Sequence, residues 1–383
     1  MKQGRIALLT DGIYPYVMGG MQRHSYFLAK YLAKKGIYVD LYHTPGKSTY
    51  DPSKLEFFTG VERDFIHPIL IPFPDMGRLP GHYIKESFRY SAMILEELKK
   101  RPETDFIYAK GFTGWKLISE KSKGLKLPPI GVKFHGLEMF QAPASFRSRF
   151  ESMLLRGPTR YCMKHADHVF SYGGKITELI RSIGVSENKI VEIPSAIESS
   201  LVQMNIGPKN DPLKFVFVGR YEPRKGLKEL SKSVMSLPGS GFEMHFIGPI
   251  PHSKRIERAG VVYHGAVTES RQLLDIIRSC DVLICPSYSE GMPNVILEAM
   301  SQGLAIIATD VGAVSLLVSS ENGRLLSSPD EKILANSLLE FTKMNPAGLE
   351  EMKKGSLRKI REFTWEVTIE KFISFLNAVS LRD

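Results

Sequence analysis

The chain has 383 residues, of which 43% are hydrophobic and 24% charged, a globular composition in which no region is expected to be disordered. Its length exceeds what one compact core commonly holds, which predicts two domains. No run approaches the ~20 apolar residues of a membrane-spanning helix, and Cys162, Cys280 and Cys285 form no CxxC pair, which argues against a zinc site and indicates reduced, buried thiols.

The excess of positive charge lies in the first half of the chain. Residues 1–197 contain 29 lysines and arginines against 19 acidic residues, whereas residues 198–383 contain 22 of each. This imbalance favours an anionic partner such as a lipid surface, a phosphorylated acceptor or nucleic acid, although scattered solvated lysines would give the same totals. No basic–aromatic motif of a nucleic-acid module is present, so nucleic acid is not expected. The first residues lead directly into a strand without room for a signal peptide, which predicts a cytoplasmic protein.

Short apolar runs without polar alternation recur along the chain, as is typical of parallel strands covered on both faces. In the first half these runs are Ile6–Leu9, Val39–Tyr42, Phe106–Ala109, Gly131–Phe134, Val169–Ser171 and Ile190–Ile193. In the second half they are Phe215–Val218, Met244–Ile247, Val261–Tyr263, Val282–Cys285 and Ala305–Ala308. Amphipathic segments such as Ser25–Lys35 separate them. The alternation predicts an α/β fold with parallel sheets.

The strand–helix pattern begins again near residue 213. A polar segment at 198–212, which contains the run Gly207-Pro208-Lys209-Asn210-Asp211-Pro212, precedes it and is typical of a linker. We therefore expect two Rossmann-like, doubly wound domains at residues 1–198 and 207–363, with ligands bound in the cleft at the carboxyl ends of their strands. The last helix, about residues 364–383, carries Trp365 and Phe372 and is expected to pack back on the first domain.

Two loops of the first half follow predicted strands and carry candidate ligand contacts. Gly19-Gly20 would let backbone amides approach a ligand closely, although a Gly-Gly pair is more often an ordinary turn. His135, in the run Lys133-Phe134-His135-Gly136-Leu137-Glu138, could hydrogen-bond a sugar, but a lone histidine at a strand end is as often structural. Each signal is weak by itself.

The loop after the first strand of the second half is strongly basic. It reads Val218-Gly219-Arg220-Tyr221-Glu222-Pro223-Arg224-Lys225-Gly226. Arg220 and Lys225 bracket a turn at the strand's carboxyl end, where they could stabilise charge on a departing diphosphate. The GxxxxGK[ST] order is absent, so this is not a Walker loop, and a solvated basic turn is the alternative.

A second loop of this half leads from the strand Val282–Cys285 into a helix through Ser289-Glu290-Gly291-Met292-Pro293-Asn294. Pro293 suits a first helical turn, and Gly291 allows close approach of a ligand, so the free amides and the helix dipole form an anion site. Glu290 and Glu298 cannot bind phosphate but can accept hydrogen bonds from hydroxyl groups, one from a sugar and the other from a ribose. The alternative is a pair of solvated carboxylates.

Several other kinds of site are not supported. A GxGxxG run is absent, which argues against a dinucleotide-dependent dehydrogenase. The histidines lack metal-ligand spacing, and Asp281 and Asp310 are isolated, so no essential metal and no bound cofactor are expected.

With these motifs the chain resembles glycosyltransferase family 4, the retaining nucleotide-sugar transferases of GT-B fold. The resemblance rests on the Gly-Gly turn at 19–20, HGLE at 135–138, GRYEPRKG at 219–226, FIGP at 246–249, HGAV at 264–267 and SEGMPNVILEAM at 289–300. It runs through nearly the whole chain and is stronger in the second half. The chain departs from the family at Gly312-Ala313-Val314-Ser315-Leu316, where a glutamate is usual after the glycines.

The resemblance implies a role for each matching position. Arg220 and Lys225 would hold the donor diphosphate, Glu290 the transferred sugar and Glu298 the ribose, while His135 would lie near the reacting sugar. Further donor contacts would come from Gly20, Gly219, Val267, Gly291, Met292, Pro293 and Asn294. The family's route is front-face attack, in which the leaving diphosphate helps to deprotonate the acceptor. It also implies a UDP- or GDP-sugar as donor.

The expected activity is therefore transfer of a sugar to an acceptor hydroxyl, in the synthesis of cell-surface polysaccharide or glycolipid. A nucleotide-sugar epimerase of the same fold and a non-catalytic nucleotide-sugar-binding partner are the alternatives. The acceptor would bind the basic first domain and could be lipid-linked. The run Ser145–Arg156 mixes apolar side chains with three arginines and could lie on the anionic inner face of the membrane, or else simply cover the sheet.

Overall fold

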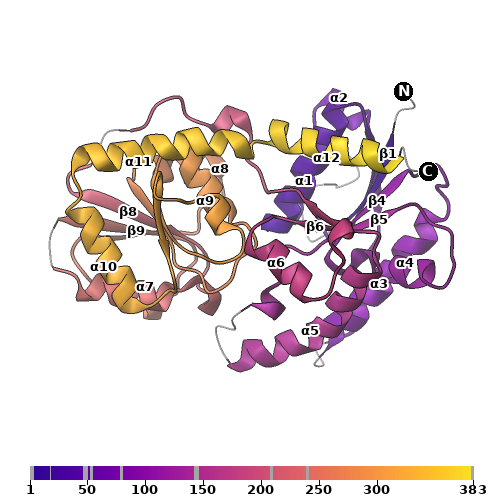
Figure 1. The fold of residues 1–383 in the computed structure, drawn as a ribbon, viewed down its shortest axis with the longest axis horizontal. Helices are drawn as coiled ribbons and strands as arrows, with labels where there is room; N and C mark the ends of the chain where they lie inside the picture. Colours follow the sequence, from indigo (N-terminus) through magenta and orange to yellow (C-terminus); the bar gives the residue numbers. More distant parts are fainter. Residues whose placement is uncertain are drawn as a thin grey trace.

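The computed structural model describes residues 4–17, 19–45, 51, 55–77, 81–141, 146–207, 210–238 and 241–380. These residues form two parallel sheets, one of seven strands and one of six, each covered by helices on both faces (Figure 1). The α/β class with two doubly wound parallel sheets, predicted from the apolar runs, is confirmed.

The seven-stranded sheet has the order β3-β2-β1-β4-β5-β6-β7. Its strands are β1 (Arg5–Leu9), β2 (Tyr38–His43), β3 (Ile66–Leu70), β4 (Phe106–Lys110), β5 (Ile130–Lys133), β6 (His168–Ser171) and β7 (Ile190–Glu192). The helices of this half are α1 (Gly20–Lys34), α2 (Gly60–Arg63), α3 (His82–Leu98), α4 (Trp115–Lys121), α5 (Phe146–His165) and α6 (Lys175–Ser182). Both faces of the central strands are buried, which explains why β1 and β4 are apolar along almost their whole length.

The six-stranded sheet has the order β10-β9-β8-β11-β12-β13. Its strands are β8 (Leu213–Val218), β9 (Phe242–Ile247), β10 (Val261–Gly265), β11 (Val282–Cys285), β12 (Ala305–Thr309) and β13 (Gly323–Leu326). The helices in this part of the chain are α7 (Leu227–Ser236), α8 (Ser270–Arg278), α9 (Asn294–Ser301), α10 (Glu331–Thr342) and α11 (Pro346–Lys359).

The last helix, α12 (Trp365–Ser380), lies beside α1 and not beside the second sheet, as Figure 1 shows in yellow. Trp365, Ile369 and Phe372 are buried in the core between α1 and the first sheet. Where the chain returns, residues 363–365 run next to the linker, because Ile197 donates its amide to Phe363 and accepts one from Trp365. The two crossings between the halves are thus hydrogen-bonded to each other.

In each sheet the strand order reverses at one point, between β1 and β4 and between β8 and β11. Helices leave on opposite faces at such a reversal, so the strand ends open a crevice in which ligands of doubly wound folds bind. The basic loop 219–226 follows β8, and the loop 286–293 follows β11. Topology alone therefore places both predicted donor loops at the same crevice.

Candidate active site

The loops after β8 and β11 are fastened together by their backbones. Gly226 has a φ of +66°, in the left-handed region that favours glycine, and an added Cβ would lie 1.9 Å from the carbonyl oxygen of Pro286. The amide of Tyr288 donates to the carbonyl of Arg224 at 2.8 Å. The side chains of the two loops are consequently held in fixed positions relative to one another.

Glu290 lies at the centre of the side chains that these two loops bring together. Its carboxylate is almost completely buried and accepts hydrogen bonds from Lys225 Nζ at 2.6 Å and from Ser287 Oγ at 2.8 Å. The Arg224 guanidinium lies 3.6 Å from the second carboxylate oxygen. A buried carboxylate needs such compensation, and the result is a rigid cluster of one acid and two cations at the crevice.

Arg220 lies at the start of the same basic loop, with its side chain turned outward. Its side chain is 72% exposed and pairs with Glu222 at 2.9 Å. Glu222 also forms an ion pair with Arg224 at 2.9 Å. Lys225 and Glu290 are therefore in direct contact, whereas Arg220 stands at the outer edge of the same loop. An added Cβ on Gly219, the first residue of that loop, would lie 3.1 Å from the Phe217 ring of β8.

Residues 290–294 form part of the surface on which the two halves meet. Gln141 of the first half donates its side-chain amide to the Glu290 carbonyl at 2.8 Å, and Ser195 donates its hydroxyl to Asn294 Oδ1 at 3.2 Å. The Ser195 amide approaches the sulfur of Met292 at 3.2 Å. An added Cβ on Gly291 would lie 1.9 Å from the His135 carbonyl oxygen.

The Gly-Gly turn of the first half reaches the same place. An added Cβ on Gly20 would lie 3.5 Å from the side-chain nitrogen of Asn294. Gly20 is the first residue of α1 and Asn294 is the first residue of α9. Two helix N-termini, one from each half, therefore converge next to Pro293 and concentrate partial positive charge there.

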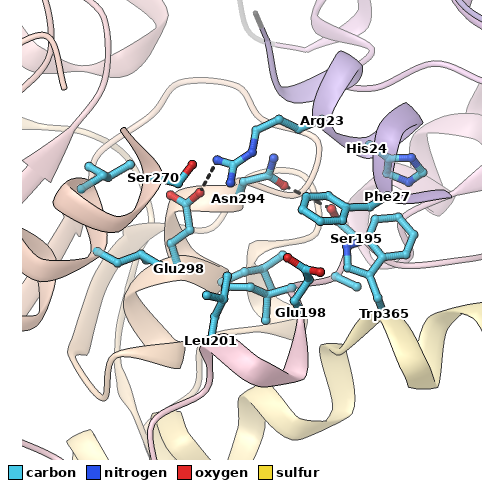
Figure 2. A pocket seen from close by; sticks show the side chains of 15 residues that line it. Arg23, His24, Phe27, Ser195, Glu198, Leu201, Ser270, Asn294, Glu298 and Trp365 are labelled. Carbon is cyan, nitrogen blue, oxygen red and sulfur yellow. Dashed lines mark hydrogen bonds and ion pairs between the residues drawn. The ribbon is translucent and has the colours of Figure 1, made fainter. Parts of the chain in front are cut away.

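Glu298, about one turn inside α9, is bound from the first half as well. Arg23 of α1 donates to Glu298 Oε1 at 2.9 Å, as the dashed line in Figure 2 shows. Val267, expected near the base, is partly buried against the core of the second half.

A small pocket lies between the halves beside this ion pair (Figure 2). Its walls include Arg23, Phe27, Ser195, Asn294 and Glu298, and its volume of about 40 Å³ holds only a few water molecules. A ligand of nucleotide size can enter this junction only if the halves move apart.

His135 is partly buried just after β5, where its Nδ1 is hydrogen-bonded to the Tyr172 hydroxyl. Burial, together with nearby Lys110 and Lys133, lowers the pKa of His135 well below its usual range. The ring is therefore neutral at physiological pH. Among the described residues no partner is present for its Nε2. His135 can thus exchange hydrogen bonds with a ligand but brings no charge.

Two lysines are buried close to His135. Lys133 Nζ donates to the Ile193 carbonyl at 2.8 Å and lies 3.9 Å above the Tyr172 ring, and Lys110 Nζ is 2.8 Å from His24 Nδ1. Burial lowers the pKa of Lys133 to about 7. Between pH 7 and the ordinary lysine pKa near 10.4 the unfolded chain therefore holds a proton that the folded chain lacks, so folding becomes more favourable as pH rises.

Replacing this lysine should remove that pH dependence. We expect the free energy of unfolding of the wild type, minus that of Lys133→Met, to rise by about 1.4 kcal/mol per pH unit between pH 8 and 10. Urea unfolding of both proteins at several pH values measures this difference. The exposed Lys126→Met variant is the control. Parallel curves for wild type and Lys133→Met would show that the buried amine keeps its proton.

Within the described part of the chain, no three acidic, histidine or cysteine side chains gather as metal ligands would. Independence from a metal stays a prediction. Nor does any described helix combine the length and the apolar character needed to cross a membrane. The three cysteines are free and buried.

Comparison with known families decides the class of the protein. Residues 18–201 match the model of Glycosyltransferase Family 4, and residues 212–343 match the model of Glycosyl transferases group 1. The chain belongs to glycosyltransferase family 4. It is accordingly an enzyme, and the resemblance expected from its motifs is confirmed.

The relatives of this glycosyltransferase are distant in sequence, but the similarity extends over most of the chain. A Bacillus subtilis glycosyltransferase named for teichuronic acid biosynthesis is 25% identical over 72% of this chain and 71% of its own length. An N,N'-diacetylbacillosaminyl-diphospho-undecaprenol alpha-1,3-N-acetylgalactosaminyltransferase of Campylobacter jejuni is 23% identical over 67% and 71%. A D-inositol 3-phosphate glycosyltransferase of Acidothermus cellulolyticus is 22% identical over 92% and 84%.

Solved structures confirm the GT-B fold. The sucrose-phosphate synthase of Thermosynechococcus elongatus superposes with a TM-score of 0.80, at 18% identity, over the full length of both chains. Anabaena HepE, solved in complex with UDP-glucose, gives a TM-score of 0.68 at 15% identity, over 98% of this chain and 99% of its own.

Four residues at the junction were not predicted from the sequence: Arg23, Gln141, Ser195 and Arg224. Arg23 follows the Gly-Gly turn by one helical turn, so a cation near the cleft was detectable from helix periodicity. Arg224 was visible as the neighbour of Lys225. Gln141 and Ser195 lie in loops without any local signal, and only the docking of the two halves places them.

Proposed function

We propose that this glycosyltransferase takes a hexose from a UDP-sugar and transfers it to an acceptor hydroxyl with retention of the anomeric configuration. The observation that carries the proposal is the Lys225–Glu290 pair, 2.6 Å apart at the β8–β11 crevice and covered by His135 and Gln141 of the other half. A cation and a hydroxyl-accepting carboxylate side by side suit the two ends of a sugar–phosphate bond.

In this proposal Lys225 stabilises the negative charge that develops on the leaving diphosphate, and Arg220 adds a second cation from the loop's outer edge. The convergent N-termini of α1 and α9 supply amides for the phosphates, near Gly20 and at 291–294. Glu290 binds hydroxyl groups of the sugar, Glu298 binds the ribose, and the base lies towards Val267. Neutral His135 hydrogen-bonds the sugar.

Retention is proposed because Glu290 is tied to Lys225 and Ser287, which leaves it poorly suited to attack the anomeric carbon as a nucleophile. Front-face attack needs no such nucleophile. The acceptor hydroxyl approaches from the side of the departing diphosphate and gives its proton to a phosphate oxygen. The enzyme then contributes positioning and charge stabilisation.

UDP is preferred to GDP in the proposal because structural neighbours such as Anabaena HepE are solved with UDP-glucose. A lipid-linked acceptor is supported by the Campylobacter jejuni relative, whose name specifies a diphospho-undecaprenol substrate. The Bacillus subtilis relative is named for a cell-wall polymer, which supports a role in polysaccharide synthesis.

Donor hydrolysis tests this function without knowledge of the acceptor. We expect the enzyme to release UDP slowly from UDP-glucose or UDP-N-acetylgalactosamine, and faster than it releases GDP from GDP-mannose. Proton NMR of the first sugar released should show the α-anomer of the α-linked donor. A β-anomer would contradict retention. A rearranged nucleotide sugar would identify an epimerase, and absence of turnover with every donor would favour a non-catalytic binding protein.

A lipid-linked acceptor suggests attachment to the inner face of the membrane through the basic first half. Met153 and Leu154 of α5 are exposed, whereas Ser145 and the side chains of residues 146–151 lie outside the described part of the structure. We expect the protein to float with anionic vesicles at low salt and to be released at high salt. Flotation with neutral vesicles alone, or with none, would contradict this attachment.

A further inference from the structure

Arg23 and Glu298 join the two halves directly at the proposed donor site. Arg23 lies in the first turn of α1, and its guanidinium donates to Glu298 Oε1 at 2.9 Å. The arginine side chain is 27% exposed and the glutamate 13%. The contact is therefore shielded from water more than a surface ion pair, and a ligand reaches Glu298 only when the halves have moved apart to admit it.

The arginine is held in place before any ligand arrives. Its backbone amide donates to Gly19 at 3.0 Å, and its guanidinium carbon lies 5.7 Å from the centre of the Tyr14 ring. The helix that carries it is fixed to the linker by Lys30, which pairs with Glu198 at 2.7 Å. A planar guanidinium anchored in this way restricts the orientation of the carboxylate that it binds.

The ion pair leaves the Glu298 carboxylate able to accept further hydrogen bonds. An ionised glutamate offers about four lone-pair positions on its two oxygens, and the Arg23 bond at Oε1 uses one of them. The remaining positions can accept hydrogen bonds from the two neighbouring hydroxyls of a ribose. Arg23 can thus orient Glu298 without displacing the ligand.

We propose that Arg23 is a positioning residue for the donor: it orients Glu298 to accept the ribose hydroxyls, and so links ribose recognition to the approach of the first half. The inference rests on the proposed function, because it assumes that Glu298 faces a ribose. It gives a measurable consequence. A site built to bind a hydroxyl discriminates against an analogue that lacks it, because its polar group is then left without a partner.

Calorimetric titration with UDP and 2′-deoxy-UDP tests the proposal. We expect the wild type to bind UDP at least about 10-fold more tightly than 2′-deoxy-UDP, as for hydrogen bonds to a charged group. Arg23→Ala should lower this preference to below about 3-fold, and Glu298→Gln should lower it to the same extent. Arg23→Lys should retain an intermediate preference, since it restores the charge but not the planar geometry.

Lys175→Ala is the matched control. Lys175 of α6 also forms an ion pair between the halves, with Asp310 at 2.8 Å, but away from Glu298. This variant should keep the wild-type preference even if both nucleotides bind more weakly. The inference is overturned if Arg23→Ala weakens both nucleotides equally, or if Lys175→Ala lowers the preference as much. A wild type that binds UDP without discrimination also overturns it, whereas a wild type that binds no UDP refutes the proposed function itself.

Discussion

Lys225→Ala should lower turnover at saturating donor by about 100-fold or more, as does the removal of one preorganised donor from other charge-stabilising sites. The ammonium lies 2.6 Å from Glu290 and is only 18% exposed, so water replaces it poorly. In the proposed mechanism its charge acts on the departing diphosphate, which is more negative in the transition state than in the ground state. The loss should therefore appear in kcat more than in KM.

This substitution also leaves the buried Glu290 without its main partner, which by itself destabilises the fold. The double variant Lys225→Ala/Glu290→Gln separates the two effects, because it removes the unpaired charge. We expect it to regain thermal stability but not activity. Lys228→Ala, an exposed lysine on the next helix, is the control for charge alone. A near-normal kcat for Lys225→Ala would show that the diphosphate is stabilised elsewhere.

Gly291→Ala should lower turnover about as much as Lys225→Ala does, but through a steric clash. The added methyl group would lie 1.9 Å from the His135 carbonyl oxygen and 3.0 Å from the Tyr172 ring, both in the other half. To reach even 3.0 Å, the two backbones must separate by about 1 Å, and a displacement of that size can cost about 100-fold in rate. Each half should remain folded, because the clash lies between them.

Circular dichroism and activity assays on Gly291→Ala check this outcome together. Gly157→Ala in α5 is the matched control, since its added Cβ meets no atom within 4 Å. Activity of Gly291→Ala close to that of the wild type would mean that the halves do not close on His135 during the reaction.

The sequence predicts the buried central strands correctly, as well as the edge strands β7 and β10. Val282–Cys285 is found as β11 with unchanged bounds, and Ala305–Ala308 is found one residue longer, as β12, because both faces of these strands are covered and their runs are wholly apolar. The two strands that were missed, β3 and β13, lie at sheet edges. Pro68 interrupts the first, and Gly323 with the exposed Arg324 begins the second. Edge strands need fewer apolar residues, and in these two the proline and the exposed arginine weaken the pattern further.

Helix starts were also harder to predict than helices. The segment 25–35 was expected from its apolar stripe, but α1 begins at Gly20. No side chain caps this end, and neither Gly20 nor Gln22 is apolar. The predicted domain boundaries at 198, 207 and 363 remain predictions, although Trp365 and Phe372 are buried on the first half.

In the candidate site, local geometry was predictable and contacts between the halves were not. The spacing from Arg220 to Lys225 and from Glu290 to Glu298 is read along the chain, and strand order brings both loops to one crevice. The bonds from Arg23 to Glu298 and from Gln141 to Glu290 span 275 and 149 residues. Such contacts depend on how two folded surfaces meet. Spacing also could not show that Arg220 faces outward to Glu222.

The loop 312–316, in which the chain departs from the family pattern, contacts the candidate site through its backbone. The Ala313 amide donates to the Gly291 carbonyl at 2.7 Å, and the Lys175 amide of the first half donates to Gly312 at 3.1 Å. Both are backbone bonds. The missing glutamate side chain therefore does not remove the contacts by which this loop holds Gly291.

A crystal structure of the enzyme with UDP tests the central claim most directly. We expect the diphosphate to lie between Lys225 and the first turn of α9, with hydrogen bonds from the backbone at 291–294, and the ribose hydroxyls to lie on Glu298. A nucleotide bound with its phosphates away from Lys225, or with its ribose away from Glu298, would contradict the account.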